Sequence, residues 1–485
     1  MTTTEKVREE AGDDGTKRQF ISWVTLALMT TASVASLRPS PAMAIYGLAA
    51  VFLYLLPAVV FLLPTALVGA ELASGWTGGI YRWVSEALGK PLGFLAVWCQ
   101  FAMTIAYYPS LLAYVASTFA YVIHPSLAEN GLYVAIVIVT IYWTGVWVSS
   151  RGTKTVAGLS SFGLVVGTLV PGVVLVGLGV VFLAQGNPSA APMTPDHWLP
   201  PWTGLASLVL IVNNFLSYAG MEMNGVHVSS LREPRSEYPR SIFLATGLVL
   251  LIFILPALAI SWVMPAHQLS LTAGLMQAFQ AFFDHFGVGW LTKVVGIMLV
   301  LAALGGMLTW LAGPAKGLVQ LSRQEGYLPP VLQRLNKYGA PRNIMVAQGV
   351  ITTLIGVLYA FSDDVSSAYW MFSVITVQIY LIAYLLMFLA VVRLRKSQPD
   401  RERGFRVPAV RLVAGVGFVA SLTAMVIGFV PPEQFGDAPL WRYLIVVGGG
   451  LALIGVVAPL AFLAFRKPSW VHPEYATQPS PPREG

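Results

Sequence analysis

The fold of this chain is decided by Gly220-Met221-Glu222-Met223-Asn224-Gly225, which interrupts an apolar stretch beginning at Trp202. A second interruption, Ser36-Leu37-Arg38-Pro39-Ser40-Pro41, lies within the apolar run from Phe20 to Tyr46. One interruption carries a carboxylate and the other a cation. Backbone that leaves the helix at membrane depth needs new hydrogen-bond partners, so it survives only inside protein or beside a wet cavity. Two broken helices at corresponding positions of two halves indicate the binding site of a transporter.

The composition indicates a polytopic membrane protein. Of the 485 residues, 56% are hydrophobic and 11% are charged, whereas soluble domains carry about 25% charged residues. The apolar residues extend along nearly the whole chain, which excludes a soluble enzyme with a single anchor. Residues 1–19 and 467–485 are polar, and we expect them to be cytoplasmic tails that are disordered in part. The N-terminus has no signal-peptide pattern.

A membrane span needs about 20 mostly apolar residues, and the sequence predicts twelve such spans. They are Phe20–Tyr46, Leu48–Ala73, Pro91–Val122, Gly131–Val148, Val156–Leu183, Trp202–His227, Ser241–Val263, Val288–Val319, Ile344–Phe361, Tyr369–Leu394, Val410–Val430 and Leu440–Phe465.

The basic residues recur in every second loop between these spans, and only Arg38, Lys293 and Arg442 fall outside that pattern. The positive-inside rule therefore predicts that both termini are cytoplasmic. Lys293 and Arg442 lie at outer helix ends, where their side chains can reach water. The net charge of +7 is explained by these loops and does not indicate a nucleic-acid partner.

The spans divide into two sets of five, each led by a broken helix, and two extra spans. This predicts repeat one at about 20–184, repeat two at about 202–395 and two further helices at about 410–465, all within a transporter domain at 20–466. An odd number of spans per repeat inverts the second repeat relative to the first, so the two breaks meet near the midplane. Half-helix ends offer N–H groups to anions and carbonyls to cations, which suits a zwitterionic amino acid.

Several short motifs resemble a known family. They are Ser217–Glu222 with His227-Val228, Glu233-Pro234-Arg235, Tyr238-Pro239-Arg240, Gly78–Trp83, Trp310–Pro314, Gly326–Pro330 and Gly339–Pro341. In this order and spacing they resemble the amino acid–polyamine–organocation (APC) transporters, and most closely the bacterial glutamate/GABA antiporters. The resemblance implies an all-α LeuT-type 5+5 inverted repeat with twelve transmembrane helices, located in the inner membrane. Arg38-Pro39 and Gly306 depart from that group, in which acidic residues are expected, so the resemblance does not extend to substrate identity.

Glu222 and Arg38 are the first candidates for the substrate site, because ionisable groups inside spans are costly and are functional by default. Glu222 could bind a substrate amino group, couple protons or act as a gate; alternatively it staples the broken helix, with Arg38 as its partner. Arg38 could receive a substrate carboxylate through its bidentate fork; alternatively it forms a buried ion pair or a gate. The ionisable residues within the spans amount to little beyond these two.

The remaining candidates are polar, aromatic or small residues near the breaks or on the neighbouring spans. For substrate binding they are Thr30, Thr31, Ala32, Ser33, Ser217, Tyr218, Gly220 and Trp310, and for gating or cavity lining Gln100, Tyr107, Tyr108, Asn224, Tyr380 and Tyr384. Close packing of small residues and core packing of aromatic rings are the alternatives for most of them. His227 could sense pH or be an ordinary helix residue.

The sequence predicts a secondary active amino-acid transporter, an exchanger by its closest subgroup. A proton-coupled amino-acid or polyamine permease is the near alternative, and a non-transporting membrane sensor is the remote one. Six scattered histidines and the single cysteine, Cys99, give no metal-ligand pattern, and no nucleotide-binding motif is present. We therefore expect no cofactor and no catalysis. The expected partners are an amino-acid substrate and the lipid bilayer, with a proton as a further candidate and no nucleic acid.

Overall fold

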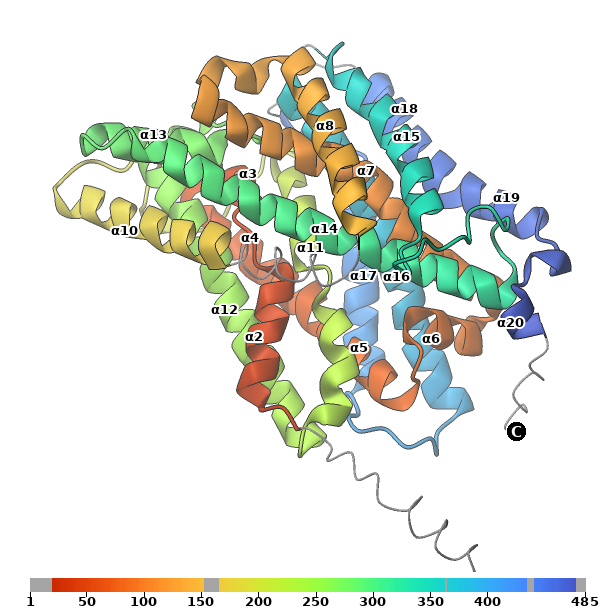
Figure 1. Ribbon diagram of the computed structural model, residues 1–485. Coiled ribbons are helices and arrows are strands. Elements are labelled where there is room, and N and C mark those ends of the chain that lie inside the picture. The colour runs from red at the N-terminus through yellow and green to blue at the C-terminus, as the bar shows by residue number, and fades with distance from the viewer. Residues whose placement is uncertain (1–19, 152–164, 363, 434–439, 477–485) are drawn as a thin grey trace, which may run out of the picture.

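The computed structural model (Figure 1) describes residues 20–151, 165–362, 364–433 and 440–476, and every regular element in these ranges is helical. Eleven helices in the described part of the chain are long and apolar enough to cross a membrane. They span Gly47–Gly75, Lys90–Ile123, Gly131–Ser149, Val166–Ala184, Leu205–Gly225, Pro234–Val263, Leu291–Glu325, Arg342–Tyr359, Val365–Ser397, Val410–Ile427 and Leu440–Ala464. With the first span, which is divided, they account for the twelve predicted spans. The start of the fifth prediction, Val156, lies outside the described residues.

The first span is divided into α2 (Trp23–Val34) and α3 (Ser40–Ala44). The α2 helix begins where the Ser22 side chain accepts a hydrogen bond from the Thr25 backbone N–H at 3.0 Å, which satisfies one of its free donors. It ends at Ala35, whose backbone is extended. At about 1.5 Å per residue neither piece alone crosses an apolar layer of about 30 Å.

The second broken span consists of a 3₁₀ segment (Leu205–Ile211), α11 (Val212–Tyr218) and a second 3₁₀ segment, η7 (Met221–Ser230). The turn lies at Ala219-Gly220, where Gly220 has φ +106°. Because a side chain at that φ would clash with the backbone, glycine is the residue that permits this turn. The sequence predicted an interruption over residues 220–225, and the structure shows that the chain beyond Gly220 continues as a tighter helix.

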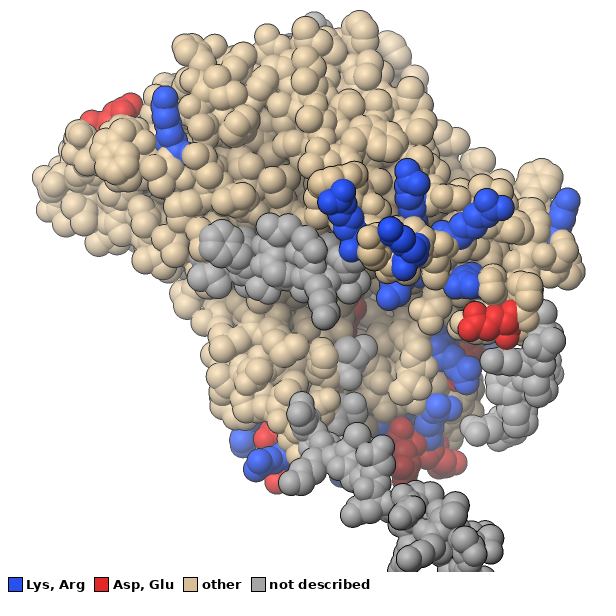
Figure 2. Space-filling view, in the orientation of Figure 1, with Lys and Arg blue, Asp and Glu red and all other residues tan. Residues whose placement is uncertain are grey.

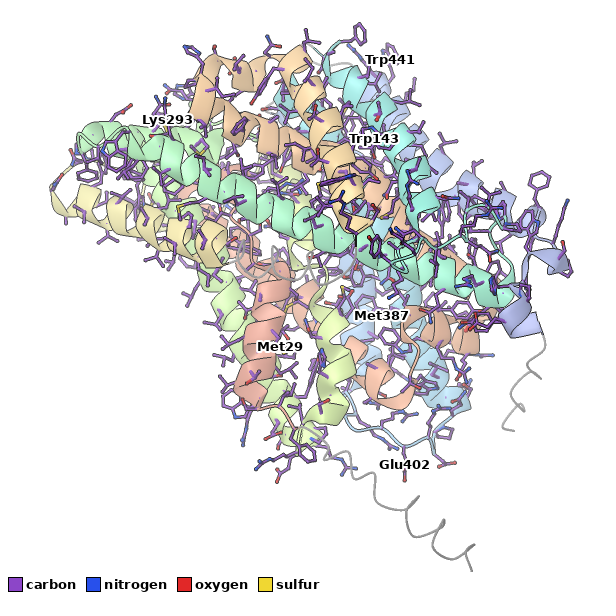
Figure 3. All side chains as sticks on the ribbon, in the orientation of Figure 1. Met29, Trp143, Lys293, Met387, Glu402 and Trp441 are labelled. Carbon is purple, nitrogen blue, oxygen red and sulfur yellow. The ribbon has the colours of Figure 1, made fainter. Side chains whose placement is uncertain are left out.

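The centre of the molecule is formed by α7 (Lys90–Ile123) and α16 (Val365–Ser397), which pack against each other. In each, 83% of the most apolar stretch is buried, against 17% for the last span, α18 to α19 (Leu440–Ala464), which lies at the periphery. The second span comprises α4 (Ala50–Pro57), a π-helical turn (Ala58–Leu62) and α5 (Leu63–Gly75). A loop that contains Glu402 lies at the opposite end of the molecule from Lys293 and Trp441 (Figure 3).

The remaining described helices complete this bundle and its connections. They are α6 (Gly79–Leu88), α8 (Gly131–Ser149), α10 (Val170–Ala184), α12 (Pro234–Val263), α13 (Gly274–His285), α14 (Leu291–Glu325), α15 (Arg342–Tyr359) and α17 (Val410–Ile427). On the face in Figure 2, Lys and Arg gather over the lower and right-hand parts, while one basic side chain stands at the upper left, where Figure 3 labels Lys293.

Glu71, in the second span, is a fully buried carboxylate that the sequence analysis overlooked. It accepts hydrogen bonds from Arg395 Nε at 2.7 Å and Nη2 at 2.6 Å, and from the Val407 backbone N–H at 2.7 Å. Arg403 Nε lies 3.8 Å away; burial lowers the pKa of Arg403, and Glu71 opposes that shift. The expectation that the spans hold few ionisable residues besides Arg38 and Glu222 was therefore wrong for this end of α5. The basic partners of Glu71 lie more than 300 residues further along the chain, so no local pattern in the sequence indicates that this carboxylate is buried in an ion pair.

Part of the C-terminal tail is ordered against α14, where the sequence predicted partial disorder. The His472 backbone N–H donates to the Arg323 carbonyl at 2.9 Å, and Gln333 Nε2 donates to the Trp470 carbonyl at 2.8 Å. These contacts fix a short helix, α20 (Pro473–Ala476), at the end of α14. Residues 1–19 and 477–485 lie outside the described ranges.

Candidate functional site

Glu222 lies directly after the second break, and its side chain is 4% exposed. Its carboxylate accepts hydrogen bonds from the Tyr384 hydroxyl at 2.8 Å, the Tyr380 hydroxyl at 3.1 Å and the Gly220 backbone N–H at 3.1 Å. All three donors are neutral. The ion pairs found among the described residues also include none with Glu222. This carboxylate is therefore available to bind a cationic group or a proton.

The second span holds Glu222 in position by very close packing. A Cβ added at Gly69 of α5 would lie 2.6 Å from the Glu222 Cβ and 3.1 Å from its Cα. Gly225 of η7 packs against the same residue of α5, because a Cβ added at Gly225 would lie 3.0 Å from the Gly69 carbonyl oxygen. Two glycines thus allow the backbones of α5 and η7 to touch, and the position of Glu222 follows from that contact.

Arg38 lies in the first break and is half-buried. Its Nε donates to the Tyr369 hydroxyl at 3.1 Å, and its Nη2 donates to the hydroxyls of Ser110 at 2.8 Å and Ser373 at 3.3 Å. The guanidinium also lies over the rings of Tyr107 (5.3 Å) and Tyr369 (5.1 Å). All of these partners are neutral, and the ion pairs found among the described residues include none with Arg38.

Arg38 and Glu222 are therefore not paired with each other in this structure. Four rings, which we call the aromatic wall, connect their surroundings: Tyr107, Trp310, Tyr380 and Tyr384. The Trp310 ring lies 6.3 Å from the rings of both Tyr107 and Tyr380, and the Tyr380 and Tyr384 rings lie 4.8 Å apart. Arg38 touches the first ring of the wall and Glu222 accepts hydrogen bonds from the last two, so the cation and the carboxylate lie at its opposite ends.

Further candidates lie beside this arrangement. Asn224 Nδ2 donates to the Ser33 hydroxyl at 3.2 Å, which joins the two broken spans, and Ser33 and Ala32 are exposed. Gln100 lies next to the Tyr380 hydroxyl. A Cβ added at Gly220 would lie 3.9 Å from the Trp310 ring, so the turn itself faces the aromatic wall.

Other candidates have contacts elsewhere. The Tyr218 hydroxyl donates to the Tyr54 carbonyl at 2.8 Å, and the Tyr108 ring packs edge-on against Tyr142. Three further candidates have hydroxyls that donate to carbonyls of their own helices, namely Thr30, Thr31 and Ser217. His227 lies half-buried in η7, and no side-chain hydrogen bond is described for it.

The sequence analysis did not identify the three residues that hold the Arg38 side chain, namely Ser110, Tyr369 and Ser373. A signal for them exists, because Tyr369, Ser373, Tyr380 and Tyr384 recur at intervals of four or seven along one face of an apolar helix. A polar and aromatic stripe on a buried span marks the face directed at a functional cavity. No group of three or more potential His, Cys, Asp or Glu metal ligands occurs among the residues that the structure describes.

Comparison with known proteins identifies the family. The profile of the family described as amino acid permease matches residues 21–451. The chain belongs to the amino acid permease family. It is 35% identical over 442 residues to an uncharacterized transporter of Legionella pneumophila, covering 90% of this chain and 95% of that protein. It is 30% identical over 448 residues to the glutamate/gamma-aminobutyrate antiporter of Lactococcus lactis strain IL1403, and this match covers 90% of this chain and 88% of the antiporter.

A solved structure supports the fold. The crystal structure of MhsT in complex with L-phenylalanine matches with a TM-score of 0.56 and 16% identity, covering 85% of this chain and 98% of that one. The predicted LeuT-type architecture and the predicted APC membership are thus confirmed. The family and the two sequence relatives are described as transporters rather than enzymes. Together with the eleven apolar helices of the described residues, this makes the chain a multi-pass membrane protein of the amino acid permease family.

Proposed function

We propose that this protein is a secondary active amino-acid exchanger that works by alternating access around a site between its two breaks. Both termini would lie in the cytoplasm and the protein in the inner membrane, as the distribution of basic loops favours. The observation that carries the proposal is the position of an uncompensated cation and an uncompensated carboxylate at opposite ends of one aromatic wall. A zwitterion would supply the missing counter-charge to both.

At one end, Arg38 would receive a carboxylate of the substrate. A cation held at membrane depth by neutral groups alone is costly, and a carboxylate that accepts from its fork offsets that cost. Tyr369, Ser110 and Ser373 would fix the direction of the fork before the substrate arrives. This arrangement favours an amino acid with an acidic side chain, such as glutamate, as one of the exchanged substrates.

At the other end, Glu222 would bind the substrate amino group. The Tyr380 and Tyr384 hydroxyls hold its two oxygens, and the faces of the aromatic wall can stabilise a nearby ammonium group. A decarboxylated amine keeps the group that Glu222 binds but loses a carboxylate. Such an amine is therefore a reasonable counter-substrate for exchange.

Counterflow in reconstituted vesicles tests this proposal. Vesicles loaded with an unlabelled amino acid or amine should accumulate radiolabelled glutamate, and Glu222→Gln should abolish uptake while the protein remains folded. Arg38→Gln should lower the preference for glutamate over a neutral amino acid about 10- to 100-fold, because a hydrogen bond to a charged group contributes about 1.5–3 kcal/mol. Glu129→Gln and Arg442→Gln are the controls, because both side chains are charged, exposed and outside the site. No uptake of any amino acid or amine by the wild type would overturn the proposal.

A proton-coupled permease is the second candidate, favoured by the neutral surroundings of Glu222. Since this carboxylate forms no ion pair with any residue that the structure describes, it can take up a proton without breaking one. Uptake into unloaded vesicles driven by an imposed pH gradient would favour this candidate over exchange. Uptake that requires internal substrate at every gradient would exclude it.

A further inference from the structure

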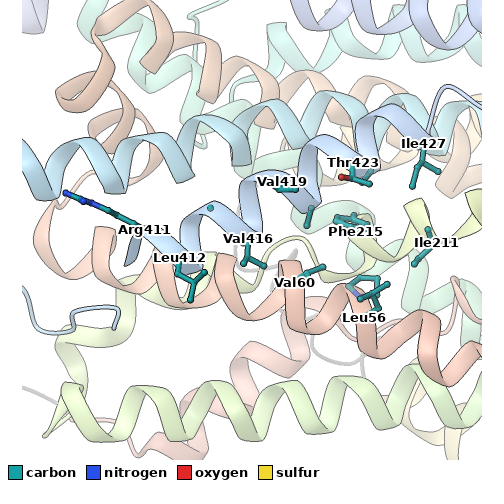
Figure 4. A pocket seen from close by; sticks show the side chains of 14 residues that line it. Leu56, Val60, Ile211, Phe215, Arg411, Leu412, Val416, Val419, Thr423 and Ile427 are labelled. Carbon is teal, nitrogen blue, oxygen red and sulfur yellow. The ribbon is translucent and has the colours of Figure 1, made fainter. Parts of the chain in front are cut away.

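A long apolar groove lies along one side of α17. It has a volume of about 550 Å³ and lies between α17, the part of the second span around Pro57, and α11 (Figure 4). We call it the α17 groove. Its lining includes Leu56 and Val60 of the second span, Phe215 of α11, and Val416 and Val419 of α17.

The shape of the α17 groove follows from the sequence around it. Pro57 lacks a backbone N–H and is followed by a π-helical turn, so the regular α-helical hydrogen-bond pattern of the second span is interrupted beside the groove. On the opposite wall, Gly415 of α17 has no side chain to fill the groove, and a Cβ added there would meet no atom within 4 Å. The groove is therefore built into the backbone of two spans.

The charge at one end of the α17 groove identifies its occupant. Nearly all of the lining is apolar, but Arg411 stands at one end and is exposed. From Arg411 to Ile427 the α17 lining extends about 24 Å at about 1.5 Å per residue, most of an apolar layer about 30 Å thick. Arg411 follows the basic loop between α16 and α17, which the positive-inside rule assigns to the cytoplasmic side. A molecule with one anionic end and a long hydrocarbon chain fits this pattern.

The wall of the α17 groove also leads to the transport site. The Phe215 ring lies 4.8 Å from Phe61, and Phe61 lies edge-on to Tyr384 at 5.1 Å. Tyr384 in turn donates to Glu222. Three aromatic rings in series, Phe215, Phe61 and Tyr384, thus connect the wall of the groove with the carboxylate at the second break.

We propose that the α17 groove binds an anionic phospholipid of the cytoplasmic leaflet, with an acyl chain along α17 and the headgroup phosphate at Arg411. Bound lipid fills the space behind Phe215 and steadies the Phe61–Tyr384 contact that positions Glu222. The binding half of this proposal is independent of the transported substrate, and its effect on exchange rests on the proposed function.

The first test measures stability, which does not require transport. Phosphatidylglycerol added to the purified full-length protein in detergent should raise its thermal midpoint in a saturable way, because a ligand that binds the folded state stabilises it. Phosphatidylcholine should not do so to the same extent. Gly415→Leu, which fills the groove, should abolish the shift, and Arg411→Gln should require about fivefold more lipid, as expected for one basic contact. Gly177→Leu is the matched control, since a Cβ there also meets nothing within 4 Å.

The second test measures exchange in vesicles of phosphatidylcholine with and without phosphatidylglycerol. Phosphatidylglycerol should accelerate exchange by the wild type and Gly177→Leu but not by Gly415→Leu. The proposal is overturned if Gly415→Leu keeps the stability shift, if the two lipids stabilise equally, or if phosphatidylglycerol affects exchange by Gly415→Leu and wild type alike. It is also overturned if the groove is covered by a second copy, so that the wild type is dimeric in micelles and Gly415→Leu is monomeric.

Discussion

Replacing Glu71 with Gln should destabilise the protein strongly, although the two side chains have the same shape. The carboxylate accepts two hydrogen bonds from Arg395 and one from the Val407 N–H, all between 2.6 and 2.7 Å. Glutamine keeps one carbonyl acceptor and directs an NH₂ group at donors that need an acceptor. Arg395 and Arg403 then lose the only carboxylate beside them in the described part of the chain.

The magnitude follows from burial. Breaking one side of a buried ion pair costs about 3–5 kcal/mol, and Glu71 is completely buried. The Arg395 side chain is 27% exposed, so water can restore part of its hydration, and we expect the lower end of that range. A loss of about 3 kcal/mol raises the unfolded fraction about a hundredfold.

Cys99 provides the assay, because it is the only cysteine in the sequence and is completely buried. Its reaction with a maleimide fluorophore in detergent requires unfolding, and where opening and closing are fast the labelling rate follows the open population. Glu325→Gln is the control, since it breaks contacts with Lys90 and Arg466, two basic side chains that are exposed to solvent, and each such contact contributes about 0–1 kcal/mol. Equal labelling rates for Glu71→Gln and Glu325→Gln would refute the reasoning.

Three further predictions concern single contacts near the site. Gly69→Ala places a Cβ against Glu222, so it should lower the free energy of unfolding by about 1–3 kcal/mol and slow counterflow. The control Gly177→Ala adds its Cβ in open space and should have neither effect. Unchanged counterflow in Gly69→Ala would show that this close approach is unimportant. Tyr384→Phe removes the shortest hydrogen bond to the carboxylate and should reduce the counterflow rate at least tenfold, since such a bond contributes about 1.5–3 kcal/mol; a wild-type rate would argue against a positioning role. Asn214→Leu removes the side-chain donor to the buried Leu53 carbonyl of α4 and should lower the free energy of unfolding, measured by Cys99 labelling, by about 1–3 kcal/mol. An unchanged labelling rate would contradict the role of this hydrogen bond.

The arrangement of the spans could be predicted largely from the sequence. Apolar runs of about 20 residues have one stable solution in lipid, because every backbone group must be paired within the segment. Positions where the pattern fails, such as Gly220 and Arg38, could therefore be identified as breaks without coordinates. The detailed geometry of the second break could not, since a 3₁₀ helix and an α-helix have nearly the same sequence preferences.

The candidate site was predicted in part. Glu222, Trp310 and Tyr380 could be selected because ionisable and aromatic residues stand out in apolar spans. Ser110 could not, because an isolated serine in a membrane helix usually serves packing or bonds its own backbone. Tyr369 and Ser373 belong to a stripe that the sequence does contain, but the stripe does not show that their partner is Arg38. The importance of these three residues depends on reaching one guanidinium from two different helices.

The sequence by itself determined that this chain crosses the membrane twelve times and that two of its spans are broken by opposite charges. These properties depend on the free energy of transferring each segment from water to lipid, and that free energy is determined by the residues of the segment itself. Only the tertiary structure decided that Arg38 and Glu222 do not pair, that four rings lie between them, and that Glu71 has its partners at the end of α16 and in the loop that follows it. Those outcomes depend on contacts between residues that are 150 to 330 positions apart, and a linear pattern does not record which distant groups meet.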